Sequence, residues 1–271
     1  MPELPEVETI RKQLNKLTTN KSIVSAEFFG PSKMINLPKN KFLKLLVGAK
    51  IVQVDRRAKL LVLELNNGYG LLTHLKMTGK YLFDAEKDKH THLVMYLSGK
   101  HTLGFKDVRK FGYLKIFKQK EIPKILDKEY GPEPLEKNFI LKKFEGMLTK
   151  KPKSQIKQLL MDQKFIAGIG NIYAQEVCFY ARIRPERKVH TLTKKEIKKL
   201  YEGIIKILKD AIKCGGTTAD DYLDCYGKQG NYFSKLKVYG RKGKKCVRCR
   251  ATLMESRLGG RGTVYCPKCQ K

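Results

Sequence analysis

The sequence predicts a multidomain α+β protein, in which an N-terminal helix and an antiparallel β-sandwich precede a helical region and a cysteine-rich tail. Short β-branched and aromatic runs dominate the first half of the chain, and amphipathic helical patterns dominate the second. Four of the seven cysteines fall in the last 26 residues. The links between the strand runs are too short for crossover helices, so the strands should pair antiparallel. A length of 271 residues is enough for two domains with ordinary cores.

The first predicted element is a helix over residues 5–17. Val7, Ile10, Leu14 and Leu17 recur on one helical face. The chain begins MPELPEVETI, and proline suits a first helical turn just as carboxylates suit a helix N-terminus. By itself, therefore, this stretch is consistent with a rigid helix entry.

Six strand-like segments follow the helix. They are bounded by turn signals such as Asn67-Gly68 and Ser98-Gly99. Their sequences are KSIVSAEFF, AKIVQVD, KLLVLEL, GLLTHLK, THLVMYL and YLKIF. Short runs of this composition with tight connections predict an antiparallel sandwich.

After the proline-containing stretch KEYGPEPLEKNF, the pattern of apolar residues becomes typical of helices. Short helices are predicted over 154–161 and, after the tight GIGN, over 171–180. Thr193 and Glu196 form a capping box at the start of a longer helix. That helix carries an apolar stripe of Ile197, Leu200, Tyr201, Ile204, Ile205, Leu208 and Ile212. We expect the stripe to be core.

These signals divide the chain into three predicted domains. The strand-rich domain spans 1–125 and the helical domain 126–240, including a polar, glycine-containing loop at 217–235. The tail, 241–271, is the third.

The tail has the ligand spacing of a Cys₄ zinc site. Cys246, Cys249, Cys266 and Cys269 form two C-x₂-C pairs separated by 16 residues. Two disulfides are the alternative. They are disfavoured because the sequence shows no signal-peptide pattern, so we expect an intracellular protein, and disulfides are rare in such proteins. Four thiolates leave no open metal position, so one Zn²⁺ with a structural role is expected.

The charge of the chain predicts a polyanionic partner. There are 57 Lys and Arg against 26 Asp and Glu, a formal net charge of +31. Nucleic acid is the first candidate, and an anionic membrane surface is the second. No stretch approaches the roughly 18 apolar residues of a spanning helix. We therefore expect a soluble, cytoplasmic protein with no membrane partner.

Several segments in this order resemble the bacterial formamidopyrimidine-DNA glycosylase (MutM) family from residue 2 to the last cysteine. They are PELPEVET, RRAKL, HLKMTGK, DVRKFG, GIGNIYAQE and GGRGTVYCPKC. Endonuclease VIII, a relative that opens PEGPE, fits less well because Leu4 stands where that pattern has glycine. The resemblance implies a catalytic β-sandwich, a helix-two-turn-helix domain whose loop 217–235 caps the lesion, and a zinc finger.

The resemblance also implies an activity and its catalytic residues. It implies a bifunctional glycosylase and AP lyase that removes oxidised purines and cleaves the strand by β,δ-elimination. Pro2 resembles the nucleophile, once Met1 is removed, and Glu3 the acid and base beside it. Lys59 resembles a strand lysine that contacts the lesion phosphate and assists catalysis. Ala58, just before it, replaces a glycine usual in the family.

Further residues are implied as DNA contacts. Thr78 departs from a glutamate common in relatives, which puts any contact of that side chain with the extruded base in doubt. Glu6 lies in the same opening motif and is either a pocket residue or a plain helix carboxylate. The predicted phosphate contacts are His74, Lys157, Asn171 and Arg261. The predicted residues that fill the space left by the extruded base are Met77, Arg109 and Phe111.

The implied partner is double-stranded DNA with a damaged base or an abasic site, bound by a monomer associated with the nucleoid. With at most four cationic phosphate contacts, the expected slope of log affinity against log salt is about −3 to −4. Two alternatives stay open at this point. One is a zinc-containing nucleic-acid-binding protein without catalysis, and the other is an endonuclease VIII-like glycosylase for oxidised pyrimidines.

Overall fold

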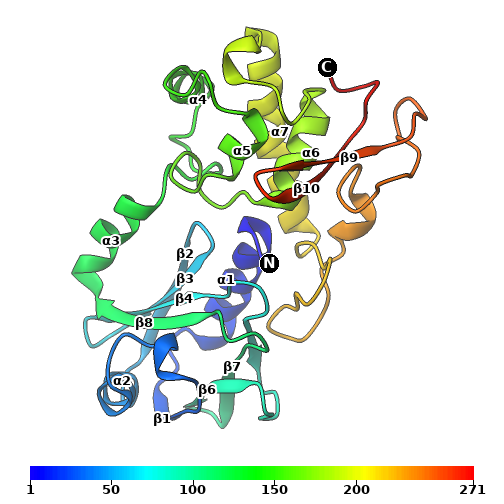
Figure 1. Cartoon of the computed structure of the whole chain (residues 1–271). Helices are drawn as coiled ribbons and strands as arrows, with labels where there is room; N and C mark the ends of the chain where they lie inside the picture. The colour runs from blue at the N-terminus through cyan, green and yellow to red at the C-terminus, as the bar shows by residue number, and fades with distance from the viewer. The chain divides into compact units, whose positions relative to one another are not determined.

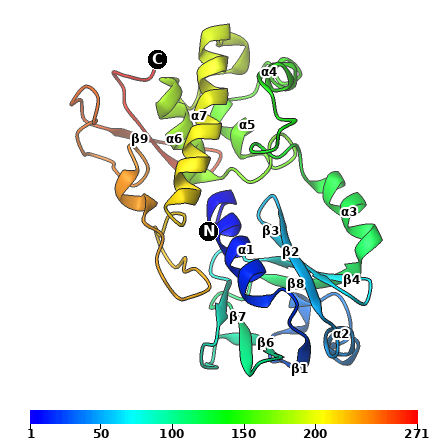
Figure 2. The same cartoon turned by 180° about the vertical axis from the view of Figure 1, so that it is seen from behind.

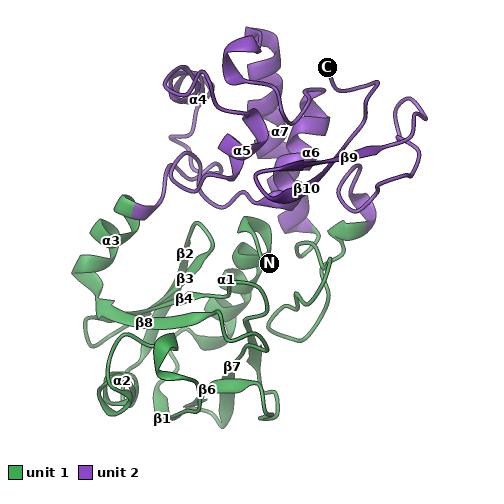
Figure 3. Cartoon of the chain, in the orientation of Figure 1, with its two compact units in different colours: residues 1–128, 214–233 green, residues 129–213, 234–271 purple.

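The computed structural model describes residues 1–271 and divides them into two compact units. Unit 1 comprises residues 1–128 and 214–233, and unit 2 comprises 129–213 and 234–271 (Figure 3). Each unit is therefore built from two separate stretches of the sequence. No helix is both long enough and apolar enough to cross a bilayer.

Unit 1 contains two four-stranded antiparallel sheets (Figure 1). The first has the order β1 (Ile23–Phe28), β6 (Thr91–Leu97), β7 (His101–Lys106), β5 (Lys80–Phe83). The second has the order β2 (Ile51–Arg57), β3 (Leu60–Leu65), β4 (Tyr69–His74), β8 (Tyr113–Lys118). The predicted antiparallel pairing is confirmed for every strand.

The two sheets and the first helix share one apolar core. Helix α1, Leu4–Thr18, packs along β2 (Figure 2). Its buried Ile10 belongs to the same cluster as Leu63 of β3 and Met95 of β6. Both sheets thus contribute buried side chains to one cluster, which is the arrangement of a sandwich.

Two short connections of unit 1 cross from one sheet to the other, in addition to the longer one from β1 to β2. Residues 75–79 join β4 to β5, and residues 107–112 join β7 to β8. His74 pairs with Tyr113 in one sheet, and Lys80 pairs with Lys106 in the other. Both crossings therefore start and end at neighbouring strand positions and run side by side.

Unit 2 is mainly helical and ends in a β-hairpin. Its elements are α4 (Leu141–Thr149), α5 (Ile156–Met161), α6 (Asn171–Ala181), α7 (Lys194–Lys213), β9 (Met254–Leu258) and β10 (Arg261–Tyr265). The predicted capping box is present, because the amide of Thr193 donates to Glu196 Oε2 at 2.8 Å and the amide of Glu196 donates to Thr193 Oγ1 at 3.3 Å.

Five elements were not predicted from the sequence. They are α2 (Lys39–Leu46), β5, β7, α3 (Ile122–Glu129) and α4. Strand β7 contains Gly104 and polar residues, so its composition does not mark it as a strand. It forms because β6 and β5 pair with its two edges.

Candidate functional site

The start of α1 is fixed by one buried carboxylate. Glu6 is 1% exposed, and its Oε2 accepts the backbone N–H of Glu3 at 2.7 Å. Its Oε1 accepts the backbone N–H of Thr217 at 2.7 Å. Pro2 is buried immediately before this pair, and Glu3 is 2% exposed. The first residues of the chain are thus tied both to their own helix and to the segment 214–233.

Gly216 permits this close approach. Its φ of +85° lies in the left-handed region, and a Cβ placed there would sit 2.9 Å from Glu6 Cγ. Any other residue would push the segment away from Glu6.

Lys59 lies in the turn between β2 and β3, which a half-buried ionic network supports. Arg56 donates from Nε to Glu8 Oε2 at 3.0 Å and from Nη1 to the carbonyl of Ala58 at 2.8 Å. Burial alone would raise the pKa of Glu8, but hydrogen bonds and charges from Arg11 and Arg56 hold that pKa below its usual value. The network therefore stays ionised at neutral pH and holds the turn before Lys59.

Ala58 occupies a conformation that favours glycine. Its φ is +54° and its side chain is fully buried. The expected family glycine is thus replaced by the smallest residue with a Cβ, in a backbone position that costs such a residue about 1–2 kcal/mol.

His74 ends β4 close to Lys59 and is held neutral. Burial, followed by the charges of Lys76 and Lys59, lowers the pKa of His74 to about 3. Its Nδ1 accepts the backbone N–H of Lys76 at 2.9 Å, so the ring proton lies on Nε2. His74 can therefore offer a neutral N–H donor to an anion, and no positive charge.

Met77, Arg109 and Phe111 lie on the two neighbouring crossings between the sheets. Met77 is 37% exposed and Phe111 is 51% exposed, which is high for large apolar side chains. The guanidinium of Arg109 lies 4.9 Å from the centre of the Phe111 ring. The structure brings the three predicted residues to one edge of unit 1.

In unit 2, three further predicted residues meet at strand β10. Lys157 of α5 is fully buried and donates from Nζ to Thr263 Oγ1 at 2.7 Å. Asn171, the first residue of α6, donates from Nδ2 to the carbonyl of Gly262 at 3.3 Å. Arg261 opens the strand and is exposed.

Two buried side chains that sequence reasoning left unassigned hold this arrangement together. Gln175 accepts the backbone N–H of Val264 at 2.7 Å and donates to the carbonyl of Asn171 at 2.9 Å. Glu176 accepts backbone N–H groups of residues 237–239 at 2.9–3.1 Å. Both lie in the segment GIGNIYAQE, but nothing local in that pattern indicates which long-range amides they would bind.

The four predicted cysteines form a cluster suited to one zinc ion. Their sulfur atoms all lie within 4.8 Å of one another, and the Cys246–Cys269 and Cys249–Cys266 Sγ pairs are 3.9 and 3.5 Å apart. Tetrahedral Zn–S bonds of about 2.3 Å require S–S separations of about 3.8 Å, so the donor set fits. A backbone hydrogen bond from Ala251 lowers the pKa of the Cys249 thiol to about 7.

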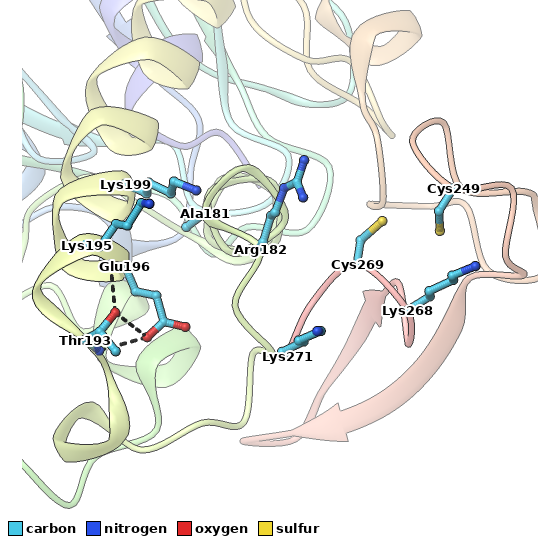
Figure 4. A pocket seen from close by; sticks show the side chains of 10 residues that line it. All are labelled: Ala181, Arg182, Thr193, Lys195, Glu196, Lys199, Cys249, Lys268, Cys269 and Lys271. Atoms are coloured by element: carbon cyan, nitrogen blue, oxygen red, sulfur yellow. Dashed lines mark hydrogen bonds between the residues drawn. The ribbon is translucent and has the colours of Figure 1, made fainter.

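A cationic hollow of about 540 Å³ lies beside this cluster (Figure 4). Cys249 and Cys269 form part of its wall. Its one acidic side chain, Glu196, is bound by Arg187 and Thr193. The basic residues that line it are Arg182, Lys195, Lys199, Lys268 and Lys271.

Comparison with known proteins gives matches along the whole chain. Family models match the formamidopyrimidine-DNA glycosylase N-terminal domain at residues 1–114 and its H2TH domain at 130–222. A third model, the zinc finger found in FPG and IleRS, matches residues 243–271.

Individual relatives match over their full lengths. A formamidopyrimidine-DNA glycosylase of Listeria monocytogenes is 41% identical over 277 residues, with 100% of both chains covered. The solved structure of a Lactococcus lactis FPG mutant with Fapy-dG containing DNA is similar at a TM-score of 0.92 and 39% identity, with 100% of both chains covered. A complex of Lactococcus lactis Fpg with abasic site containing DNA also gives 0.92 and 39%, with 99% of both chains covered.

Proposed function

The chain belongs to the formamidopyrimidine-DNA glycosylase family, and on that premise we propose that it is a bifunctional enzyme of base excision repair. It removes 8-oxoguanine and formamidopyrimidines from duplex DNA and then cleaves the strand by β,δ-elimination. One observation carries the proposal: PELPEVET places a proline at position 2 and a carboxylate at position 3, both buried at the start of a capped helix.

Pro2 acts as the nucleophile. Removal of Met1 turns the ring nitrogen of Pro2 from an amide into a secondary amine. The lone pair of this amine attacks C1′ of the damaged nucleoside, the N-glycosidic bond breaks, and the base leaves. Opening of the sugar ring then gives an iminium that joins Pro2 to the DNA. Glu3 is the adjacent acid and base that moves protons in these steps.

Residues of unit 1 bind the DNA around the reacting sugar. Lys59 contacts the lesion phosphate and assists catalysis, and His74 donates its Nε2–H to a phosphate oxygen. Met77, Arg109 and Phe111 occupy the space that the extruded base leaves. Two exposed apolar side chains beside a guanidinium support this role, because apolar wedges unstack base pairs.

Residues of unit 2 bind the DNA backbone. Arg261 grips a phosphate beside the lesion, and Asn171 at the start of α6 holds another, where amide groups at a helix N-terminus favour an anion. Lys157 adds a positive charge beside β10, where its ammonium group is bonded to Thr263. Zinc keeps the β9–β10 hairpin, and with it Arg261, in place.

The same premise gives the domain roles and the partner. We assign residues 1–125 to the catalytic domain, 126–240 to the helix-two-turn-helix domain with capping loop 217–235, and 241–271 to the zinc finger. Most of the capping loop packs with the catalytic domain, because residues 214–233 belong to unit 1. The partner is duplex DNA with a damaged base or an abasic site. A single lesion offers no symmetry to a dimer, so the enzyme acts as a monomer.

Borohydride trapping tests the proposal. The purified chain is incubated with a duplex that carries one 8-oxoguanine opposite cytosine, and the iminium is reduced to a stable adduct. We expect a covalent adduct at residue 2, and none when Met1 is retained. Pro2→Gly still offers a terminal amine and serves as the matched variant that retains this chemistry in weakened form.

The other outcomes are equally informative. An adduct only with an oxidised pyrimidine would move the activity to the endonuclease VIII class. No adduct with either lesion or with an abasic site would leave a zinc-containing DNA-binding protein without catalysis.

A further inference from the structure

The two crossings that carry Met77, Arg109 and Phe111 are joined by a buried hydrogen bond that no family assignment covers. Asp107 is fully buried, and its Oδ1 accepts the hydroxyl of Thr78. Thr78 is itself 6% exposed. This bond links residue 78, next to Met77, with the residue that begins the Arg109 crossing.

The Asp107 carboxylate also organises its own crossing. Its Oδ2 accepts the backbone N–H of Gly112 at 2.7 Å, and its Oδ1 accepts that of Arg109 at 3.2 Å. The Arg109 amide also lies 3.0 Å from Thr78 Oγ1. The backbone on both sides of residues 110 and 111 is therefore fixed to one carboxylate and one hydroxyl.

The surrounding packing leaves this arrangement little freedom. The main-chain carbonyl of Asp107 is 2.8 Å from the ring Nε2 of buried His92. A Cβ at Gly112 would lie 2.9 Å from Phe105 Cζ and 3.0 Å from Asp107 Oδ2. The two ends of the crossing are thus held by packing and hydrogen bonds, while Phe111 at its tip is half exposed.

We infer that the Thr78–Asp107 pair is a positioning device, which holds Met77 on one crossing at a fixed spacing from Arg109 and Phe111 on the other. The inference rests on the proposed function, in which these three side chains enter the duplex together. An insertion of this kind needs its side chains preorganised, because each one left mobile must be ordered during base extrusion.

The chemistry of Thr78 suits this role and not substrate contact. Its one hydroxyl proton is directed at Asp107, and its oxygen accepts the Arg109 amide, so its only donor and one of its two acceptor sites are used inside the protein. In this chain the side chain of Thr78 is therefore an internal support.

A matched pair of variants tests the inference. Thr78→Val keeps the shape and removes the hydroxyl, whereas Thr78→Ser keeps the hydroxyl. Thr18→Val is the control, because the hydroxyl of buried Thr18 also makes a hydrogen bond, to the carbonyl of Leu14 at 2.8 Å, and both residues belong to α1 and not to the crossings. Single-turnover rates are measured on a duplex with 8-oxoguanine and on one with a preformed abasic site.

We expect Thr78→Val to lower the base-excision rate about tenfold, the effect of an unsatisfied buried acceptor on a positioned element. Cleavage at the abasic site, where no base is extruded, should change less than about twofold in this variant. Thr78→Ser should keep the wild-type excision rate, and Thr18→Val should leave both rates as in the wild type. Equal losses on the two duplexes, or no loss in Thr78→Val, would overturn the inference.

A second measurement separates the inference from the proposed function. The chain has no tryptophan, so Phe111→Trp introduces a single fluorophore at the tip of the crossing. Adding Thr78→Val should lower its fluorescence anisotropy and raise its quenching by acrylamide, and adding Thr78→Ser should not. An unchanged anisotropy overturns the positioning role, whatever the activity. A wild-type chain inactive on every duplex overturns the proposed function, and a changed anisotropy would still establish the support itself.

Discussion

At the scale of single residues, burial decides the charge of His74. The unfolded histidine takes up a proton below about pH 6.5, whereas the folded one does so only near pH 3. Between these values the unfolded state binds more protons, so the free energy of unfolding falls as the pH falls. Well above pH 6.5 His74 is neutral in both states, so it no longer makes the free energy of unfolding depend on pH.

We predict a measurable loss of stability on mild acidification. At pH 5.0 the neutral His74 lowers the free energy of unfolding by about 2 kcal/mol relative to pH 7.5. Carboxylates with a lowered pKa, such as Glu8 and Asp88, contribute only at lower pH. Urea unfolding at both pH values should show this loss in the wild type and not in His74→Gln.

His90→Gln is the control for that experiment, because His90 is half-buried and lies outside the site. It should lose as much stability as the wild type. An equal loss in His74→Gln would mean that other groups cause the acid sensitivity.

At the scale of elements, local sequence patterns predicted the features that depend on residues close together in the chain. The apolar face of α1, the Thr193–Glu196 capping box and the cysteine spacing each lie within one short stretch of the chain, and the structure contains all three. The fold class followed from them and from the strand runs.

Elements and contacts made by distant partners could not be predicted in this way. Strand β5 and strand β7 depend on each other for pairing, and the bond between Thr78 and Asp107 spans 29 residues. Gln175 lies within the GIGNIYAQE motif, but its bond to Val264 depends on where β10 lies. A single sequence carries no signal for such pairings.

The zinc cluster gives a prediction at the same scale. Only six buried residues form the apolar cluster of the hairpin region, among them Cys246 and Cys266 themselves. Such a small core cannot offset the entropy of the ordered tail, so removal of the metal should unfold it. We expect one zinc per chain by metal analysis, and fast amide exchange over residues 246–270 after chelation, with β3 and β4 still protected.

Cys246→Ser should reproduce the effect of chelation, and Cys214→Ser, outside the cluster, should not. Retained protection of the hairpin amides in the metal-free chain would show that the tail folds without zinc.

At the scale of the whole molecule, the net charge of +31 exceeds what the predicted contacts use. Lys59, Lys157 and Arg261 are the cations assigned to phosphates, and His74 adds none. We therefore predict a slope of about −2.7 for log affinity against log salt at pH 7.5, which is shallower than the slope of about −3.6 expected for four cations. Fluorescence titration of a lesion-containing duplex between low and moderate salt measures it.

Two variants check the assignment of that slope. Arg261→Gln should make it shallower by about 0.9, and His74→Gln should leave it unchanged although affinity falls. A slope of about −3.6 or steeper in the wild type would mean that further cations contact the backbone.

The division of unit 1 into two stretches of sequence has a consequence for how the chain is made. Residues 1–128 leave the ribosome early, but the segment that supplies Thr217 to Glu6 and Cys225 to the core comes much later. At about 5–20 residues per second, the intervening residues take roughly 5–20 s to synthesise. During that interval the nascent sandwich exposes the apolar surface that Tyr222 and Cys225 later cover. A chaperone that binds apolar surfaces would act on this exposed surface of the nascent sandwich.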